Sequence, residues 1–490
     1  MQSSGRSHSA SGPAGAGLII VAGLFVAVVS IYLLINPGGF PAYFYMGYVA
    51  RFVPLLFLMV VALVWPLLPL LLALVVMFGG EALQDLVRPL FPISPFWILL
   101  ALTLGAQIAR NIHRNKSVPW GEGTILVLLA LGAALYELER PGLSSALLLI
   151  PLLAGISLVV ALGPLRTWRQ IAFVLTALYL AFVLLEWQLL PFLIPSWGAA
   201  GSVLREQFGG LSSSLRQATS LDWLFNMMAL LSVGMAVRQR GRWRVFLVGL
   251  FLAFGASSIL TVSRGAFLGL GTGMLALLLL ERRGSHRSLP WIVVAGALIV
   301  AIAYYSGSWA NNAGQRGLGV EVRALQEGGP GRLTLEWNGV KEMPRHVLIG
   351  TGPSLGAGAH SSIVGMWNNS GGIYAIIFWV FILVLFRRSY RMAKAPPGGA
   401  SGPWGSAIAL GLYVSFAGAI ANAMFDGTFY SLSFAAVFWT MRGLEIGIWK
   451  SQLITVPGSG RRTRGGITHH EAGGIQISGH IATGPSEPIT

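Results

Sequence analysis

The chain has 490 residues, of which 54% are hydrophobic and 10% are charged, and its formal net charge is +16. Because ordinary soluble domains have about 25% charged residues, this composition excludes a water-soluble globular protein. The sequence contains no cysteine, which excludes disulfides and thiolate metal sites.

Long apolar runs separated by short charged segments predict an all-α polytopic membrane protein with about 14 (12–14) transmembrane helices. Residues 1–16 are expected to be a cytoplasmic N-terminal segment, because the apolar run after them is too long for the core of a cleavable signal peptide. Pro66 and Pro69 divide the run from Phe52 to Phe78 into two short spans. The predicted spans are 17–35, 43–63, 65–78, 96–109, 123–136, 144–163, 171–194, 222–237, 245–262, 265–280, 290–306, 371–386, 406–424 and 428–441.

The distribution of basic residues supports an even number of spans. Fourteen spans place "RQRGRWR" (238–244) and "ERRGSHR" (281–287) in cytoplasmic segments, as the positive-inside rule requires, whereas thirteen would place them outside. The cytoplasmic segments are also expected to hold Arg388, Arg442 and Glu445. Both termini are therefore expected in the cytoplasm, and topology rather than a nucleic-acid partner accounts for the positive charge.

The chain is thus expected to have three parts: the N-terminal segment, a transmembrane catalytic domain over residues 17–447, and a disordered cytoplasmic tail over 448–490 that is rich in Gly, Ser, Thr and Pro. Two outer segments are longer than a helix connection requires, near residues 195–221 and 307–370. The second contains "RLTLEWNGVKEM" (332–343), whose apolar spacing predicts a helix at the outer membrane surface. We therefore expect the chemistry on the outer face.

Nucleotide and metal chemistry find no support in the sequence. "GTGPSLG" (350–356) is not the G-x-G-x-x-G fingerprint and follows no strand of a βαβ unit, and no P-loop is present. The outer segments contain neither a D-x-D-like acidic pair nor an H-E-x-x-H motif. No cofactor and no metal are therefore expected.

Arginines on the outer face are the first candidate binding residues, because positive charge is normally kept off that side. Guanidinium groups bind phosphate oxygens through paired hydrogen bonds, so several at one depth would suit a lipid-linked diphosphate. The alternative is pairing with an acid or snorkelling to lipid headgroups, which is preferred for Arg205, Arg345 and Arg51 taken singly. The candidates are Arg264 in "TVSRGAF", Arg205 and Arg216 in the first outer segment, Arg332 and Arg345 in the second, and Arg51 in the outer half of the second span.

His360 is the candidate general base. It lies between a glycine-rich stretch and the expected helix start near Ser361 and Ser362, where a neutral imidazole could accept a proton from a hydroxyl group. A helix-capping or interfacial histidine is the alternative. A serine triad also needs an orienting carboxylate, for which the sequence offers only the unpaired Asp426.

The order of these motifs resembles the O-antigen ligase and O-antigen polymerase superfamily over about residues 216–447. "SRGAFLGL" (263–270) opens a span, "RLTLEW" (332–337) and "MPRHVLIGTGP" (343–353) follow in a large outer loop, and "AHSSIVGMWNNSGGIYAIIF" (359–378) leads into the next span. Two departures are Ser361, where asparagine is commoner, and the missing Asn-Pro-Asn before Asn226.

The resemblance implies a metal-independent inverting glycosyltransferase with a GT-C-like fold in the bacterial inner membrane. Its donor would be an undecaprenyl-diphosphate-linked glycan, and its acceptor a lipid A core or a lipid-linked repeat in the periplasmic leaflet. Arg264 matches the Ser-Arg-Gly arginine, Arg216 the earlier loop arginine with Arg205 as fallback, Arg332 the arginine before Trp337, and His360 the loop histidine. In the family, the arginines engage the diphosphate and the histidine is proposed to activate the acceptor.

Three alternatives remain open at this point. Ligase and polymerase differ only in the acceptor, and no residue decides between them. A protein O-glycosyltransferase would use the same site. A transporter or flippase of lipid-linked oligosaccharide predicts internal repeats and charges in mid-membrane; the sequence shows no repeat and few such charges.

Overall fold

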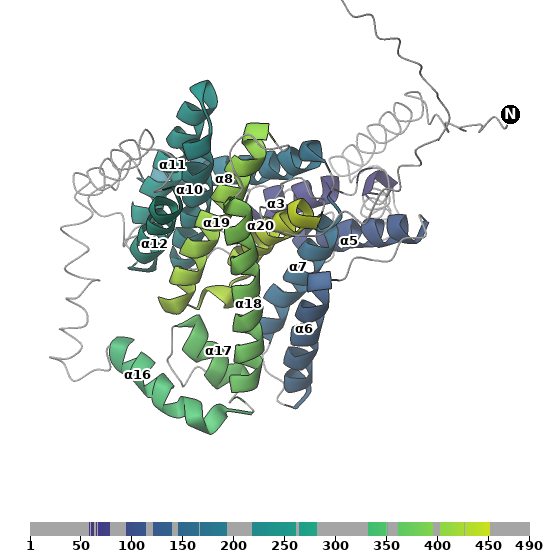
Figure 1. Cartoon of the computed structure of the whole chain (residues 1–490). Helices are drawn as coiled ribbons and strands as arrows, with labels where there is room; N and C mark the ends of the chain where they lie inside the picture. Colours follow the sequence, from purple (N-terminus) through teal and green to yellow (C-terminus); the bar gives the residue numbers. More distant parts are fainter. Residues whose placement is uncertain are drawn as a thin grey trace, which may run out of the picture. The chain divides into compact units, whose positions relative to one another are not determined.

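The computed structural model describes residues 58, 60–62, 65, 67–78, 95–113, 121–139, 146–165, 167–193, 218–260, 264–281, 332–348, 350, 361–394, 402–425 and 427–450. Within them the chain is helical and contains no strand. The helices are α3 (Leu68–Phe78), α5 (Pro95–His113), α6 (Gly121–Glu139), α7 (Ala146–Leu162), α8 (Trp168–Leu193), α10 (Ala218–Arg238), α11 (Gly241–Leu260), α12 (Arg264–Glu281), α16 (Arg332–Glu342), α17 (Ser362–Ser370), α18 (Gly372–Ala393), α19 (Gly402–Phe425) and α20 (Leu432–Lys450), with the 3-10 helices η4 (Met343–His346) and η5 (Thr428–Tyr430) (Figure 1).

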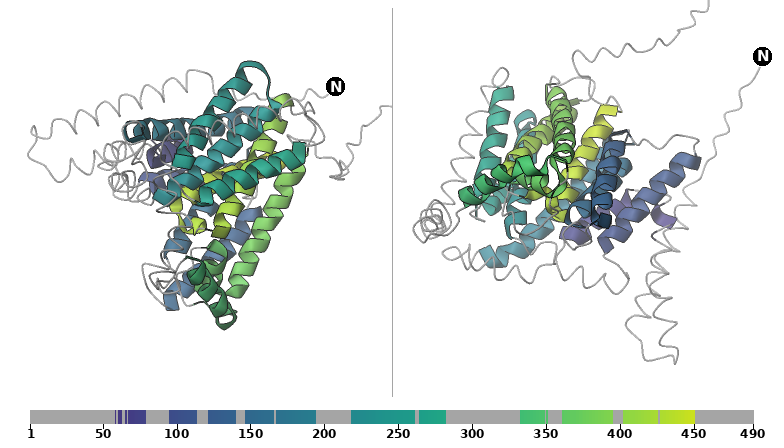
Figure 2. Two further views of the ribbon diagram at one scale, coloured as in Figure 1. Left: turned by 90° about the vertical axis from the view of Figure 1, so that its left-hand side faces the viewer. Right: turned by 90° about the horizontal axis from the view of Figure 1, so that it is seen from below.

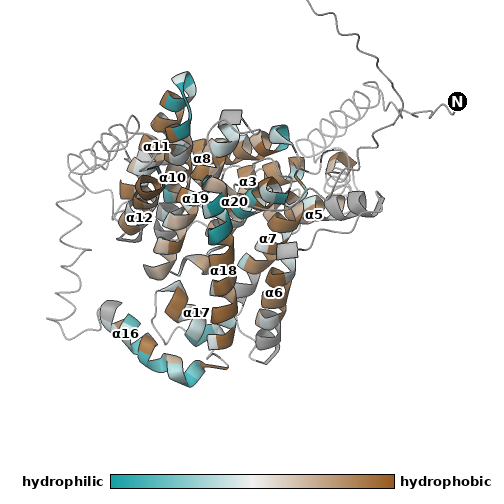
Figure 3. Ribbon diagram, in the orientation of Figure 1, coloured by the Kyte–Doolittle hydropathy of each residue, from teal (hydrophilic) through white to brown (hydrophobic). Residues whose placement is uncertain are grey.

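The helical class and the membrane character agree with the sequence. In the part of the chain that the structure describes, four segments are long and apolar enough to cross a membrane: Trp168–Glu186, Gly241–Ile259, Gly372–Ala393 and Trp404–Met424. Figure 3 shows α6, α7 and α18 as largely hydrophobic and α16 as largely hydrophilic. The expected spans 17–35 and 290–306, and most of 43–63, lie outside the described residues, so the number of fourteen stays a prediction. The expected tail has only its first residues, to Lys450, inside the described part.

Helix α20 is buried on nearly all sides, from Ser433 to Ile448. A helix that is largely apolar around its circumference belongs in the interior, and α20 contacts α7, α10, α18 and α19 (Figures 1 and 2). Small residues allow the close approach. A Cβ on Gly155 of α7 would lie 2.7 Å from Trp439 Nε1, and one on Gly443 would lie 2.8 Å from Leu162 Cβ.

Helices α10, α12 and α19 form a second tightly packed group. A Cβ on Gly234 of α10 would lie 2.6 Å from the Cα of Gly411 in α19. A Cβ on Gly273 of α12 would lie 2.5 Å from Leu230 of α10. Without side chains at these glycines, the backbones approach each other closely, which fixes how the three helices lie together.

Arg238 joins four helix ends at one end of this bundle. Its guanidinium lies 2.7 Å from Glu281 at the end of α12, and it donates to the carbonyls of Ala393 (2.7 Å) and Ser406 (3.1 Å) in α18 and α19. This Arg238 end therefore holds the C-terminal ends of α10, α12 and α18. Their N-terminal ends lie at the opposite end, called the Arg264 end after the first residue of α12. The alternation agrees with the predicted topology, and which end is cytoplasmic stays a prediction.

Candidate functional site

Helix α17 begins directly after His360 and Ser361 in the outer segment of the expected topology. Ser361 is its N-cap: the backbone is extended, and the hydroxyl accepts hydrogen bonds from the backbone N–H groups of Ile363 (3.2 Å) and Val364 (3.5 Å). This is the ordinary function of serine at a helix start. The hydroxyl of Ser361 is thereby assigned to capping.

Three hydrogen bonds dock α16 and η4 against α17. The backbone N–H of Ser361 donates to Glu336 Oε1 at 2.7 Å, Asn368 Nδ2 donates to the carbonyl of Gly339 at 2.8 Å, and Trp367 Nε1 donates to that of Met343 at 2.8 Å. The prediction that part of the 307–370 loop is helical is confirmed for α16, η4 and α17. The carboxylate of Glu336 thus lies beside the first turn of α17.

Three glycines allow the chain segments of this assembly to approach each other closely. Gly371 has a φ of 93°, and a Cβ there would lie 2.6 Å from the carbonyl oxygen of Leu348. A Cβ on Gly350 would collide with the backbone of Asn369, and one on Gly372 would lie 2.5 Å from the ring of Trp367. Close packing of neighbouring chain segments explains these three glycines.

We expect a Gly371→Ala variant to lose about 1–3 kcal/mol of stability, because a β-carbon is strained at this positive φ and also meets the Leu348 carbonyl. The shift in thermal unfolding midpoint of the purified protein measures the loss. Gly249→Ala in α11 is the control, since apart from the neighbouring backbone of its own helix no atom lies within 4 Å of the added Cβ. An equal midpoint for both variants would contradict this account of the turn.

Helix α17 lies at the Arg264 end of the bundle. It contacts α18, α19 and η5, which follows the C-terminal end of α19 (Figure 1). The side chain of Asn369 lies beside that of Tyr430 in η5. The chain that continues from His360 and the first residue of α12, Arg264, thus belong to the same end of the molecule.

Buried polar side chains lie in the apolar helices toward this end. Asn226 in α10 accepts a hydrogen bond from Ser258 in α11 at 2.7 Å, and Glu186 in α8 accepts one from Ser257 at 2.8 Å. The amide of Asn422 in α19 packs against Gly269 in α12. Sequence reasoning did not pair these residues; their signal is a polar residue within an apolar run.

The structure describes only some of the predicted site residues. Arg264 and Arg332 are the first residues of α12 and α16. Trp337 is 60% exposed on α16, with the Lys341 ammonium 5.8 Å from its ring. The side chain of Arg345 is 74% exposed and pairs with Glu342 at 2.9 Å, which agrees with the preferred alternative of an ordinary ion pair. His360, Arg216, Arg205, Arg51 and Asp426 lie outside the described residues.

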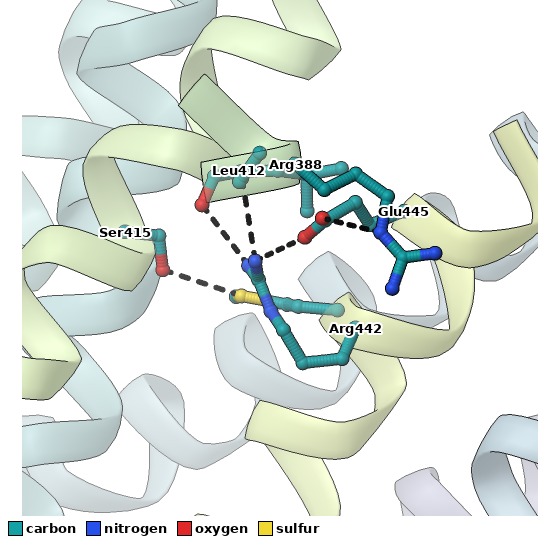
Figure 4. Close-up of polar contacts among 7 residues, drawn as sticks. Arg388, Leu412, Ser415, Arg442 and Glu445 are labelled. Carbon is teal, nitrogen blue, oxygen red and sulfur yellow. Dashed lines mark hydrogen bonds and ion pairs between the residues drawn. The ribbon is translucent and has the colours of Figure 1, made fainter. Parts of the chain in front are cut away.

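A buried charge cluster is a feature that the sequence did not predict. Arg442 and Glu445, expected in a cytoplasmic segment, lie within α20 with fully buried side chains and form an ion pair (Figure 4). Arg388 of α18 lies 3.7 Å from Glu445, and Arg442 also donates to the carbonyl of Leu412 at 3.0 Å. The ring of Phe416 lies 3.9 Å from the Arg442 guanidinium. Pairing permits the burial of these charges, and the cytoplasmic placement of the segment stays a prediction.

Among the described residues, no group of three acidic, histidine or cysteine side chains is arranged to hold a metal ion. Comparison with known proteins gives no family: no family model matches the chain, and no curated protein matches it. The resemblance to the O-antigen ligase and polymerase superfamily therefore rests on the order of the motifs in the sequence.

Proposed function

We propose that this protein is a GT-C-like glycosyltransferase, which moves a glycan from undecaprenyl diphosphate to an acceptor hydroxyl at the periplasmic face of a bacterial inner membrane. The observation that supports the proposal is the position of two helix starts at the Arg264 end of the bundle. The start of α12, with Arg264, and the start of α17, directly after His360, belong to the same end of the bundle. The motifs that resemble the superfamily contribute both elements.

The chemistry requires a stabilised leaving group and a base. The acceptor oxygen attacks the anomeric carbon, the bond from that carbon to the diphosphate oxygen breaks, and configuration inverts. His360 takes the hydroxyl proton, and undecaprenyl diphosphate leaves with the bonding electrons. Arg264 and Arg216 would neutralise the charge on the diphosphate, and a helix N-terminus such as that of α12 favours an anion as well. Arg205, Arg332 and Trp337 would contact the diphosphate or the glycan.

The direct test compares a deletion strain with its parent. If the protein is a polymerase, the surface glycans of the deletion strain should be reduced to single repeats on their usual anchor. If it is a ligase, full-length glycans should remain on undecaprenyl diphosphate in that strain. Purified protein should then transfer glycan extracted from the deletion strain to the acceptor. An unchanged glycan in the deletion strain would contradict the proposal.

Transport of lipid-linked oligosaccharide is the second candidate function, and the buried cluster of Arg388, Arg442 and Glu445 favours it. Ionisable residues inside membrane proteins often mark a transport path. Proteoliposomes separate the two functions. A flippase would move the lipid-linked glycan across the bilayer without forming a new glycosidic bond, whereas the transferase forms the bond with donor already in the outer leaflet. A protein O-glycosyltransferase would form it with a peptide acceptor.

An Arg264→Ala variant is expected to lower transfer by about 10²–10³-fold, because one preorganised charge on the leaving diphosphate is removed. Arg345→Ala is the matched control, since this outer arginine is exposed and paired with Glu342. The control should retain transfer within about twofold, as expected for an exposed ion pair. Equal activity of both variants would remove Arg264 from the proposed site.

A further inference from the structure

The hydrogen bond from Ser361 to Glu336 acts on the peptide group of His360. The donor is the Ser361 nitrogen, 2.7 Å from Glu336 Oε1, and this nitrogen belongs to the peptide bond that joins His360 to Ser361. Since a peptide group is planar, a carboxylate that fixes its N–H direction also restrains the orientation of the plane to which the His360 carbonyl belongs.

The carboxylate supplies half of a capping box from a different helix. In the usual motif, the N-cap serine accepts an N–H from the third helical residue, whose glutamate side chain accepts the backbone N–H of the N-cap. Here the Ser361 hydroxyl accepts the backbone N–H of Val364, whose side chain has no carboxylate. The backbone N–H of Ser361 is accepted instead by the carboxylate of Glu336 in α16. A capping box built within one helix would stabilise its start locally. This one links the start of α17 to α16.

Docking alone does not require this bond. Trp367 and Asn368 already hold α17 against η4 and α16 through side-chain hydrogen bonds of 2.8 Å, and both lie near the far end of α17. Glu336 acts at the end from which the chain leads back to His360. A carboxylate is also favoured near a helix N-terminus, where the helix dipole is positive.

We propose that Glu336 is a positioning residue, which orients the peptide group between His360 and Ser361 so that the histidine meets the acceptor hydroxyl. The inference rests on the proposed function, because His360 matters here as the base. Misplacement of a reacting group by about 1 Å can cost about 10²-fold in rate. Glu336 should therefore affect turnover more than donor binding.

The kinetic test uses two variants at Glu336 and one control in the same interface. With donor glycan extracted from the deletion strain, Glu336→Ala should lower kcat by about 10–100-fold while the donor KM stays within about threefold. Glu336→Gln keeps an oxygen acceptor and should restore kcat to within about threefold of the wild type. Trp367→Phe removes the bond to Met343 and should stay within about threefold.

Hydrogen exchange of the Ser361 amide provides a readout that does not depend on transfer. Exchange in peptides that include Ser361 should accelerate in Glu336→Ala and stay close to the wild type in Glu336→Gln. Unchanged exchange or an unchanged kcat in Glu336→Ala would overturn the inference. So would parallel losses of kcat in Glu336→Ala and Trp367→Phe, or a Glu336→Gln variant as slow as Glu336→Ala. A wild-type protein that transfers no glycan would instead refute the proposed function, and with it the catalytic meaning of the bond.

Discussion

An Arg442→Ala variant is expected to lose about 3–5 kcal/mol of folding stability, because removal of one partner leaves the other charge buried with less compensation. The Arg442 and Glu445 side chains are 0% exposed, so water cannot replace the lost guanidinium. The variant also leaves the Leu412 carbonyl without its hydrogen bond from Arg442 and removes the contact with the ring of Phe416. The midpoint of thermal unfolding in detergent measures the effect.

Arg391→Ala is the matched control on α18, because Arg391 is exposed and surface substitutions usually change stability by about 0.5 kcal/mol or less. An Arg442→Ala variant as stable as this control would contradict the role of the ion pair. The double variant Arg442→Met/Glu445→Leu separates stability from function, since apolar replacement of a whole buried pair is often neutral or stabilising. A stable double variant that keeps its activity would make the charges structural. A stable double variant that no longer moves the lipid-linked glycan across the bilayer would favour the transport function.

Helix positions could be predicted where the apolar runs are uninterrupted. The span expected at 222–237 is α10 (Ala218–Arg238), and that expected at 265–280 is α12 (Arg264–Glu281). The last helix is longer than the predicted span: 428–441 ends before Arg442, whereas α20 (Leu432–Lys450) continues to Lys450. Besides Glu445 in its own helix, Arg442 obtains hydrogen-bond partners from α18 and α19, and a single sequence does not show these long-range contacts.

In the assembly of α16, η4 and α17, too, the helix starts could be predicted from local sequence, whereas the contact between the helices could not. The apolar spacing of "RLTLEW" and the serines after His360 predicted helix starts that the structure contains at Arg332 and Ser362. The link between them could not be predicted, because Glu336 and Ser361 are 25 positions apart and the bond uses a backbone N–H. The missing acid at Val364 was the only local signal that a capping partner comes from elsewhere.

A His360→Ala variant is expected to lower glycan transfer by about 10²–10⁴-fold, the range typical of a general base. Donor binding should persist, because the diphosphate is assigned to Arg264 and Arg216. His346→Ala is the matched control: His346 is the other histidine of the 307–370 loop, ends η4, and is far from Ser361 in sequence. Single-turnover rates with lipid-linked donor, and separate measurement of donor binding, provide the two readouts.

The pattern of losses among these variants distinguishes the base from the binding residues. If His360 takes the acceptor proton, added imidazole should restore part of the transfer in His360→Ala, since a free base can enter the space left by the side chain. It should restore none in Arg264→Ala, where the diphosphate charge lacks its partner. Full activity of His360→Ala would remove the histidine from the mechanism, and the Glu336 bond would then be only a helix cap. Loss of donor binding in His360→Ala would instead place the imidazole on the diphosphate, beside Arg264 rather than beside the acceptor.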